Sequence, residues 1–153
     1  MTNLVSIVTP TLNRPDDVCA LLTNLAAQTR LSFELILVDA AEPADNRTQN
    51  VVNELAPSLP YPIRYFRFGG GTAIQRNYGI ERAEGDFIAF IDDDVRLGPD
   101  FFERILEVYF EDPDGKIGGV AGYITNQFFD MSKSRRWIWY RRLHVFTTFE
   151  PGR

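Results

Sequence analysis

The hydrophobic and polar positions of this chain form two alternating kinds of segment. Short apolar runs, rich in the β-branched and aromatic residues typical of buried strands, cover 4–9, 33–38, 63–68 and 86–91, and a fifth extended segment follows at 118–125. Between them, apolar residues recur at helical spacing over 13–29, 46–55, 72–82 and 99–110. Strands that alternate with helices predict βαβ units and a mainly parallel sheet, so the sequence indicates an α/β fold.

The residues at the predicted helix starts add local detail. Pro15, Asp16 and Asp17 suit a first helical turn, where proline costs no backbone hydrogen bond and acidic side chains favour the helix dipole. We expect Thr72 to cap the third helix, directly after the glycine triplet 69–71. This triplet is either a flexible hairpin-like turn or a loop whose bare backbone lets a diphosphate come close.

Composition and charge narrow the class of protein. The 153 residues suffice for one domain, and 44% apolar and 24% charged residues are ordinary for a globular protein. No apolar run reaches the ~20 residues of a membrane-spanning helix, no signal peptide is recognisable, and Cys19 is the single cysteine, so we expect a cytoplasmic protein. The net charge of −5 divides into −10 over 1–132 and +5 over 133–153, which argues against a nucleic-acid partner for the main body.

The end of the chain differs from the rest. We expect a core domain over 1–130 and a basic, aromatic tail over 131–153, the start of an acceptor-side region, in which arginines alternate with Trp137 and Trp139. The tail either makes peripheral contact with an anionic membrane surface, at the inner face of the membrane, or packs its aromatic rings against the protein. The sequence leaves both alternatives open.

The main chemical signal is an apolar strand that stops at three adjacent carboxylates, Asp92, Asp93 and Asp94. Like charges repel, and a bound Mg²⁺ or Mn²⁺ explains their proximity because hard cations take oxygen ligands and are often shared with substrate phosphates. Ligands in open α/β sheets also bind beyond the carboxyl ends of strands. If the chain stays extended, Asp92 and Asp94 point the same way and Asp93 faces elsewhere. The alternative is that the three residues only end the strand and cap the next helix.

Two turns of the chain can be compared with known phosphate-binding motifs to narrow the class of ligand. The turn at 10–13 contains no glycine, which disfavours a nicotinamide or flavin cofactor, and the triplet 69–71 lacks the G-K-[ST] ending of an ATPase loop. An aspartate cluster after an apolar strand also resembles phosphatases of the haloacid dehalogenase type. The only lysines, Lys116 and Lys133, lie outside the setting that such an enzyme needs.

Four segments in chain order carry a family resemblance. They read S-I-V-T-P-T-L-N-R-P at 6–15, Q-T and then F-E-L-I-L-V-D within 28–39, Q-R-N-Y-G-I and then A-E-G-D-F-I within 75–88, and D-D-D followed by a proline within 92–99. Together they resemble the family 2 glycosyltransferases. The resemblance implies a GT-A fold, which is an α/β/α sandwich, with a nucleotide-diphospho-sugar donor, a divalent metal and inversion at the anomeric carbon. The acceptor, a sugar, a lipid-linked molecule or a protein, stays open.

The resemblance also implies roles for individual residues. It predicts a nucleotide-sugar site that contains Pro10, Thr11, Asn13, Arg14, Asp39, Arg76, Asp92 and Asp93. Within this site, Asp39 accepts a hydrogen bond from the nucleobase and Arg76 helps to neutralise the diphosphate. Asp94 and Asp92 ligate the metal that bridges the donor phosphates. A cation there stabilises the charge that develops on the leaving phosphate.

Two features depart from the family pattern. The chain reads D-A-A-E at 39–42 where the family often has D-D-G-S, which leaves base or ribose contacts open. An inverting enzyme also needs a general base for the acceptor hydroxyl, and beyond Asp114 only Asp130 and the weak candidate Glu150 remain. We therefore expect a fragment that binds the donor and transfers sugar poorly. The alternative is a non-catalytic nucleotide-binding or interaction module.

Overall fold

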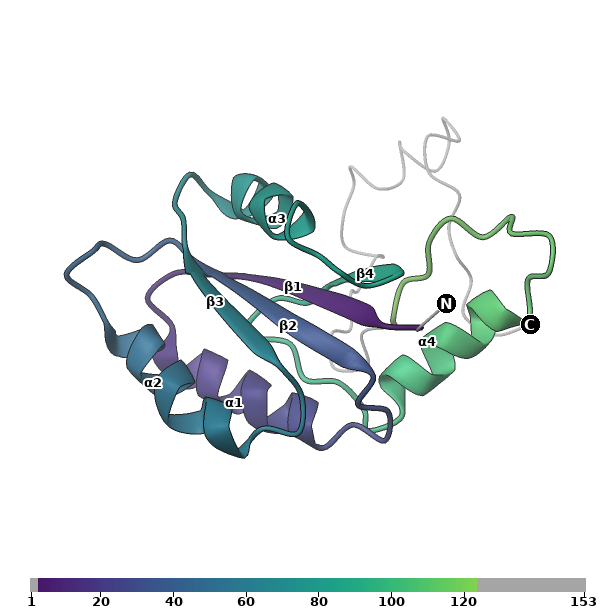
Figure 1. The fold of residues 1–153 in the computed structure, drawn as a ribbon, viewed down its shortest axis with the longest axis horizontal. Coiled ribbons are helices and arrows are strands. Elements are labelled where there is room, and N and C mark those ends of the chain that lie inside the picture. The colour runs from purple at the N-terminus through teal and green to yellow at the C-terminus, as the bar shows by residue number, and fades with distance from the viewer. Residues whose placement is uncertain (1–2, 124–153) are drawn as a thin grey trace, which may run out of the picture. The chain divides into compact units, whose positions relative to one another are not determined.

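Four strands alternate with four α-helices in the computed structural model, which describes residues 3–123 (Figure 1). In chain order they are β1 (Val5–Thr11), α1 (Pro15–Ala26), β2 (Phe33–Asp39), α2 (Arg47–Leu55), β3 (Ile63–Arg67), α3 (Thr72–Ile80), β4 (Phe87–Phe90) and α4 (Phe101–Phe110), with a 3₁₀ turn at Ala56–Ser58. The chain divides into the compact units Met1–Val120 and Ala121–Arg153, and the first is described below. The predicted tail and Glu150 lie outside the described residues, so the boundary at 130/131 stays a prediction.

The strands form one parallel sheet in the order β3-β2-β1-β4, which confirms the predicted α/β class. β1 pairs with β2 from Val5↔Phe33 to Thr11↔Asp39. Every residue of β1 and β2 is buried, because helices cover both faces of a parallel sheet. The strand order changes direction between β1 and β4, and ligands bind at such a point, beyond the carboxyl ends of the strands.

Helices lie on both faces of the sheet and complete an α/β/α sandwich (Figure 1). On one face, α1 and α2 enclose the larger hydrophobic core, to which α1 contributes fully buried leucines such as Leu21. On the other face, α3 covers a smaller core centred on Val8. A Cβ at Gly79 would collide with Val8, so this glycine lets α3 approach the sheet closely. This close approach places the start of α3 beside the ends of β1 and β2.

β1 runs two residues beyond its predicted end and includes Pro10. Pairing between β1 and β4 stops at Val8↔Phe90, so Pro10 has a strand neighbour on one side only, which is where a sheet tolerates proline. The chain after β4 leaves the sheet at this level and turns next to Thr11, to which it is hydrogen-bonded through Asp93. The two central strands therefore extend past β4 into the region where a ligand would bind.

One predicted detail is wrong. The cap position of α3 is occupied by Gly71, with a φ of 95°, and no side chain caps this helix, so Thr72 is its first residue instead. Glycine adopts this left-handed conformation without strain, and the backbone alone makes the turn. The described part of the fifth extended segment, 118–123, contains no strand. In the part of the chain that the structure describes, no helix has the length and apolar character needed to cross a membrane.

Candidate functional site

A cavity of about 860 Å³ opens at the carboxyl ends of β1 and β2. Its walls come from the turn after β1, the loops after β2, β3 and β4, and the start of α3, which are far apart in the sequence and meet because parallel strands end at one edge of the sheet. Seven predicted site residues line it, namely Pro10, Thr11, Asn13, Arg14, Asp92, Asp93 and Asp94. Asp39 and Arg76 are not part of this lining.

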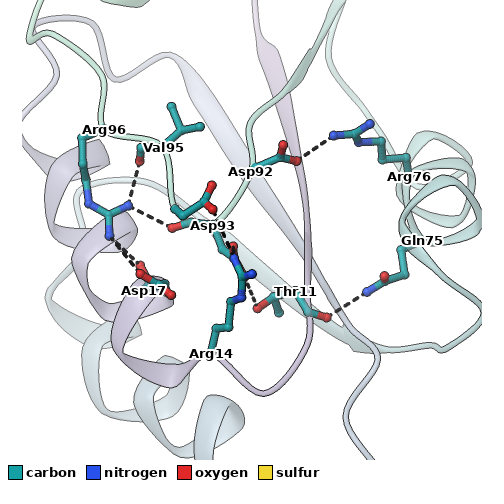
Figure 2. Close-up of polar contacts among 10 residues, drawn as sticks. Thr11, Arg14, Asp17, Gln75, Arg76, Asp92, Asp93, Val95 and Arg96 are labelled. Carbon is teal, nitrogen blue, oxygen red and sulfur yellow. Dashed lines mark hydrogen bonds and ion pairs between the residues drawn. The ribbon is translucent and has the colours of Figure 1, made fainter. Parts of the chain in front are cut away.

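Asp93 is the buried member of the acidic cluster. Its carboxylate accepts two hydrogen bonds, one from Oγ1 of Thr11 at 2.6 Å and one from Nη1 of Arg14 at 3.0 Å (Figure 2). The residue is 4% exposed, whereas the side chains of Asp92 and Asp94 are 51% and 59% exposed. Asp93 therefore ties the loop after β4 to the end of β1, and its negative charge raises the pKa of Arg14.

The exposed carboxylates, Asp92 and Asp94, are each paired with an arginine. Nη2 of Arg76 lies 2.6 Å from Oδ1 of Asp92 (Figure 2), and Nη1 of Arg14 lies 3.2 Å from Oδ2 of Asp94. Within residues 3–123 no group of three or more His, Cys, Asp or Glu could hold a metal ion alone. Two accessible carboxylates suit a hard cation that takes its remaining oxygen ligands from phosphates, so the residues fit Mn²⁺ or Mg²⁺ shared with a ligand.

The glycine triplet forms another wall of the cavity. Gly70 and Gly71 have φ values of 118° and 95°, a region that favours glycine because other side chains are strained there. The triplet joins β3 to α3 rather than two antiparallel strands, so the hairpin-like alternative is wrong. It leaves bare backbone beside the start of α3, a helix of nine residues, so a ligand can come close to the chain there.

Asp39 lies at the end of β2 and is fully buried. Its Oδ1 accepts the N–H of Ala41 at 2.9 Å, and its Oδ2 accepts the O–H of Tyr65 at 2.7 Å. Burial, together with the hydrogen bond to Asp39, raises the pKa of Tyr65 to about 12. Because a carboxylate oxygen has two acceptor sites, a nucleobase contact through Asp39 would use the second site of one of these oxygens.

Gln75 is the buried site residue that the sequence analysis missed. Its side chain lines the cavity, is 3% exposed, and donates from Nε2 to the carbonyl oxygens of Thr11 at 2.9 Å and Val38 at 2.7 Å. It thereby fixes α3 to the ends of β1 and β2. The one sequence signal is that this glutamine occupies the position of the alanine in the A-R-N pattern.

Sequence comparison gives the class to which this fold and site belong. Residues 6–152 match Glycosyl transferase family 2, so this chain belongs to that family. The chain is 35% identical over 111 residues to an uncharacterized glycosyltransferase of Haemophilus influenzae, which covers 72% of this chain and 36% of the relative. It is 33% identical over 158 residues to the uncharacterized glycosyltransferase YwdF of Bacillus subtilis, with 97% and 56% covered.

The name of a third relative includes a biosynthetic process. The putative teichuronic acid biosynthesis glycosyltransferase TuaG of Bacillus subtilis is 30% identical over 115 residues, which cover 72% of this chain and 45% of the relative. The chain thus spans between 36% and 56% of the length of these three relatives.

Solved structures agree on the fold. The S. aureus TarS fragment 1–349 in complex with UDP matches with a TM-score of 0.60 and 23% identity, over 70% of this chain and 32% of that one. The mannosyltransferase PcManGT from Pyrobaculum calidifontis, in complex with GDP-Man and Mn²⁺, matches with a TM-score of 0.54 and 22% identity, over 61% and 28%. This likeness confirms the GT-A fold that the sequence predicts.

Proposed function

We propose that this chain binds a nucleotide-diphospho-sugar together with Mn²⁺ or Mg²⁺, as the donor-binding part of an inverting glycosyltransferase. The observation that carries this proposal is one cavity at the carboxyl edge of the sheet that brings together two accessible carboxylates, Asp92 and Asp94, with Arg14 and a glycine loop. Membership of family 2 supports it, as do the relatives solved with UDP or with GDP-Man and Mn²⁺.

The chemistry of the cavity walls suggests where each part of the donor would lie. The acidic loop after β4, with Arg14, would hold the cation and the diphosphate. The walls formed by the β2 and β3 loops and by the start of α3 carry Glu42 but are otherwise uncharged, with Ala40, the bare backbone of 69–71 and Gln75. A nucleoside, which is neutral and rich in hydrogen-bonding edges, suits this second part.

The reaction requires the site to stabilise negative charge on the leaving group. When an acceptor oxygen bonds to the anomeric carbon, the bond from that carbon to the phosphate oxygen breaks, and negative charge develops on the leaving diphosphate. A bound divalent cation offsets that charge. Arg14 and Arg76 are held by carboxylates of the acidic loop. A cation that takes over Asp92 and Asp94 would release Arg76 toward the diphosphate and leave Arg14 paired only with Asp93.

Two alternatives from the sequence fare differently. Membership of the glycosyltransferase family argues against a haloacid-dehalogenase-like phosphatase. A non-catalytic nucleotide-binding module shares the donor site and differs only in that no sugar is transferred. Glu150, the weak candidate for the general base, lies outside the described residues, so donor binding and sugar transfer have to be measured separately.

The biological setting proposed here is cell-envelope polysaccharide synthesis in the cytoplasm. The named process of TuaG supports the first part. The lone cysteine supports a reducing compartment. The acceptor would be a sugar, a lipid-linked molecule or a protein, and the basic tail would supply any peripheral membrane contact.

Calorimetric titration tests the donor proposal directly. We expect one of UDP, GDP or dTDP to bind with an affinity that rises when Mn²⁺ is added, because Asp92 and Asp94 would hold a cation that also attracts the diphosphate. If none of the three nucleotides binds with or without Mn²⁺, the proposal is wrong. A parallel assay for sugar transfer then separates an enzyme from a binding module.

A further inference from the structure

The side-chain amide of Gln75 is held in one orientation. Its Nε2 makes two hydrogen bonds, to the carbonyl oxygens of Thr11 and Val38 (the first is drawn in Figure 2). Both partners are acceptors only, so the amide group that faces them has to be the NH₂. The two protons of that group are thereby used, and the direction of the remaining atom, Oε1, is determined by the ends of β1 and β2.

The carbonyl oxygen Oε1 of Gln75 has an unused hydrogen-bonding capacity. Within residues 3–123 the only hydrogen bonds of this side chain are the two that its nitrogen donates. Oε1 is not among the fully enclosed polar atoms without a partner in that part of the chain. Since Gln75 lines the cavity, the free acceptor borders the space that a ligand would occupy.

A comparison with another buried glutamine shows what is particular about Gln75. Gln28, at 4% exposure, also donates from Nε2 to a backbone carbonyl, that of Gly98. Its Oε1 is enclosed and lacks a partner, and the residue does not line the cavity. Gln75, in contrast, lines the cavity, and its Oε1 is not enclosed. Asp39, the acidic neighbour at the end of β2, has both oxygens engaged.

We propose that Gln75 is a specificity-determining residue of the donor site, whose Oε1 accepts a hydrogen bond from a base N–H or from the ribose 2′-hydroxyl of the nucleoside. This inference rests on the proposed function. A polar atom whose direction is fixed discriminates well, because a ligand that lacks the matching donor displaces water from it and leaves it unpaired. Gln75 lies in the part of the cavity whose single charged lining residue is the acidic Glu42, which favours the neutral nucleoside over the diphosphate as the partner.

Paired nucleotides identify the group that Gln75 recognises. UDP presents an N–H where CDP presents a nitrogen acceptor, and GDP and ADP differ in the same way. UDP and 2′-deoxy-UDP differ in one ribose hydroxyl. We would measure the affinity ratio of each pair by calorimetry with Mn²⁺, for the wild type, for Gln75→Met and for Gln28→Met. Methionine has a similar length and no carbonyl, and Gln28→Met controls for the loss of a buried amide elsewhere.

The expected result is that Gln75→Met reduces one of these ratios by about three- to tenfold, the size of one neutral hydrogen bond, while Gln28→Met leaves all of them unchanged. A reduced UDP/CDP or GDP/ADP ratio identifies a base N–H as the partner. A reduced UDP/2′-deoxy-UDP ratio identifies the ribose. Ratios that are equal in Gln75→Met and the wild type overturn this inference and leave the donor proposal standing. Failure of every nucleotide to bind the wild type overturns both.

A measurement on the wild type covers the case in which Gln75→Met does not fold. The chain has four glutamines, so ¹³C labelling of their side-chain carbonyls gives few NMR signals, and Gln28→Met identifies one of them. Addition of the best-binding nucleotide with Mg²⁺ should shift the Gln75 signal and leave the Gln28 signal in place. If no glutamine signal moves when the site is saturated, the proposed hydrogen bond does not form.

Discussion

At the scale of single residues, Arg14 joins two carboxylates of the acidic loop, Asp93 and Asp94. One guanidinium nitrogen lies 3.0 Å from Asp93 and 3.2 Å from Asp94. The contact with Asp93 is mostly buried on the carboxylate side, whereas Asp94 is 59% exposed and its pair with Arg14 is weak. The cation that we propose at Asp94 would therefore compete with Arg14, while the hydrogen bond from Thr11 would still anchor Asp93.

Replacement of Arg14 tests this competition. We expect Arg14→Ala to bind Mn²⁺ alone about two- to fivefold more tightly than the wild type, because Asp94 loses its competing partner and an exposed ion pair contributes little more than this. The same variant should bind the nucleotide–Mn²⁺ complex more weakly, since the diphosphate loses the positive guanidinium group of Arg14.

Electron paramagnetic resonance of free Mn²⁺ measures the affinity for Mn²⁺ alone, and calorimetry measures the affinity for the nucleotide. Arg104→Ala, which removes an exposed pair with Asp100 on α4, is the matched control. Unchanged Mn²⁺ affinity in Arg14→Ala would contradict the competition.

Tyr65 gives a prediction for pH. Its pKa in the folded protein is raised from 10.0 to about 12, first by burial and then by the hydrogen bond to Asp39. The unfolded state therefore loses the phenolic proton first. The stability that depends on neutral Tyr65 is complete below about pH 10 and is lost as the pH rises toward 12.

Urea denaturation of the wild type and of Tyr65→Phe measures this loss. The difference in unfolding free energy between the two proteins should shrink as the pH rises from about 10 toward 12. Tyr61, whose pKa is also raised, is present in both proteins and cancels. Parallel pH profiles would refute the assignment.

At the scale of elements, α3 connects the smaller core to the cavity. Gly79 packs this helix against Val8 of β1, and one turn earlier Gln75 and Arg76 reach the ends of the strands and the acidic loop. A shift of α3 would therefore change both the packing of Gly79 against Val8 and the hydrogen bonds of Gln75 and Arg76. A substitution in the small core should affect the donor site through this helix.

The substitution Gly79→Ala tests that coupling. A Cβ at this position collides with Val8, so we expect an unfolding free energy lower by about 1–3 kcal/mol and weaker nucleotide binding. Urea denaturation and calorimetry measure the two effects. Gly118→Ala is the control because a Cβ there has no neighbour within 4 Å, and its effect should stay within about 0.5 kcal/mol. If Gly79→Ala is as stable as Gly118→Ala, the helix does not depend on this contact.

At the scale of the whole molecule, the sequence predicts the parallel α/β fold and the acidic loop well, because both depend on local patterns. The apolar run before Asp92 is a strand, and parallel strands bring their ends together whatever the details of the loops. Contacts that join distant segments were not predictable. Gln75 reaches Val38 and Thr11 across 37 and 64 positions of sequence, and Tyr65 of the next strand donates a hydrogen bond to Asp39 across 26 positions.

Nucleotide titration of Asp94→Ala with and without Mn²⁺ tests the central claim, a cation shared between the acidic loop and a donor diphosphate. For the wild type, Mn²⁺ should raise the nucleotide affinity by about tenfold or more. For Asp94→Ala, the isotherms with and without Mn²⁺ should coincide while the melting temperature stays unchanged, since this side chain is exposed. Asp114→Ala, which alters an exposed carboxylate paired with Lys116, should behave as the wild type. A full Mn²⁺ effect in Asp94→Ala would contradict the account.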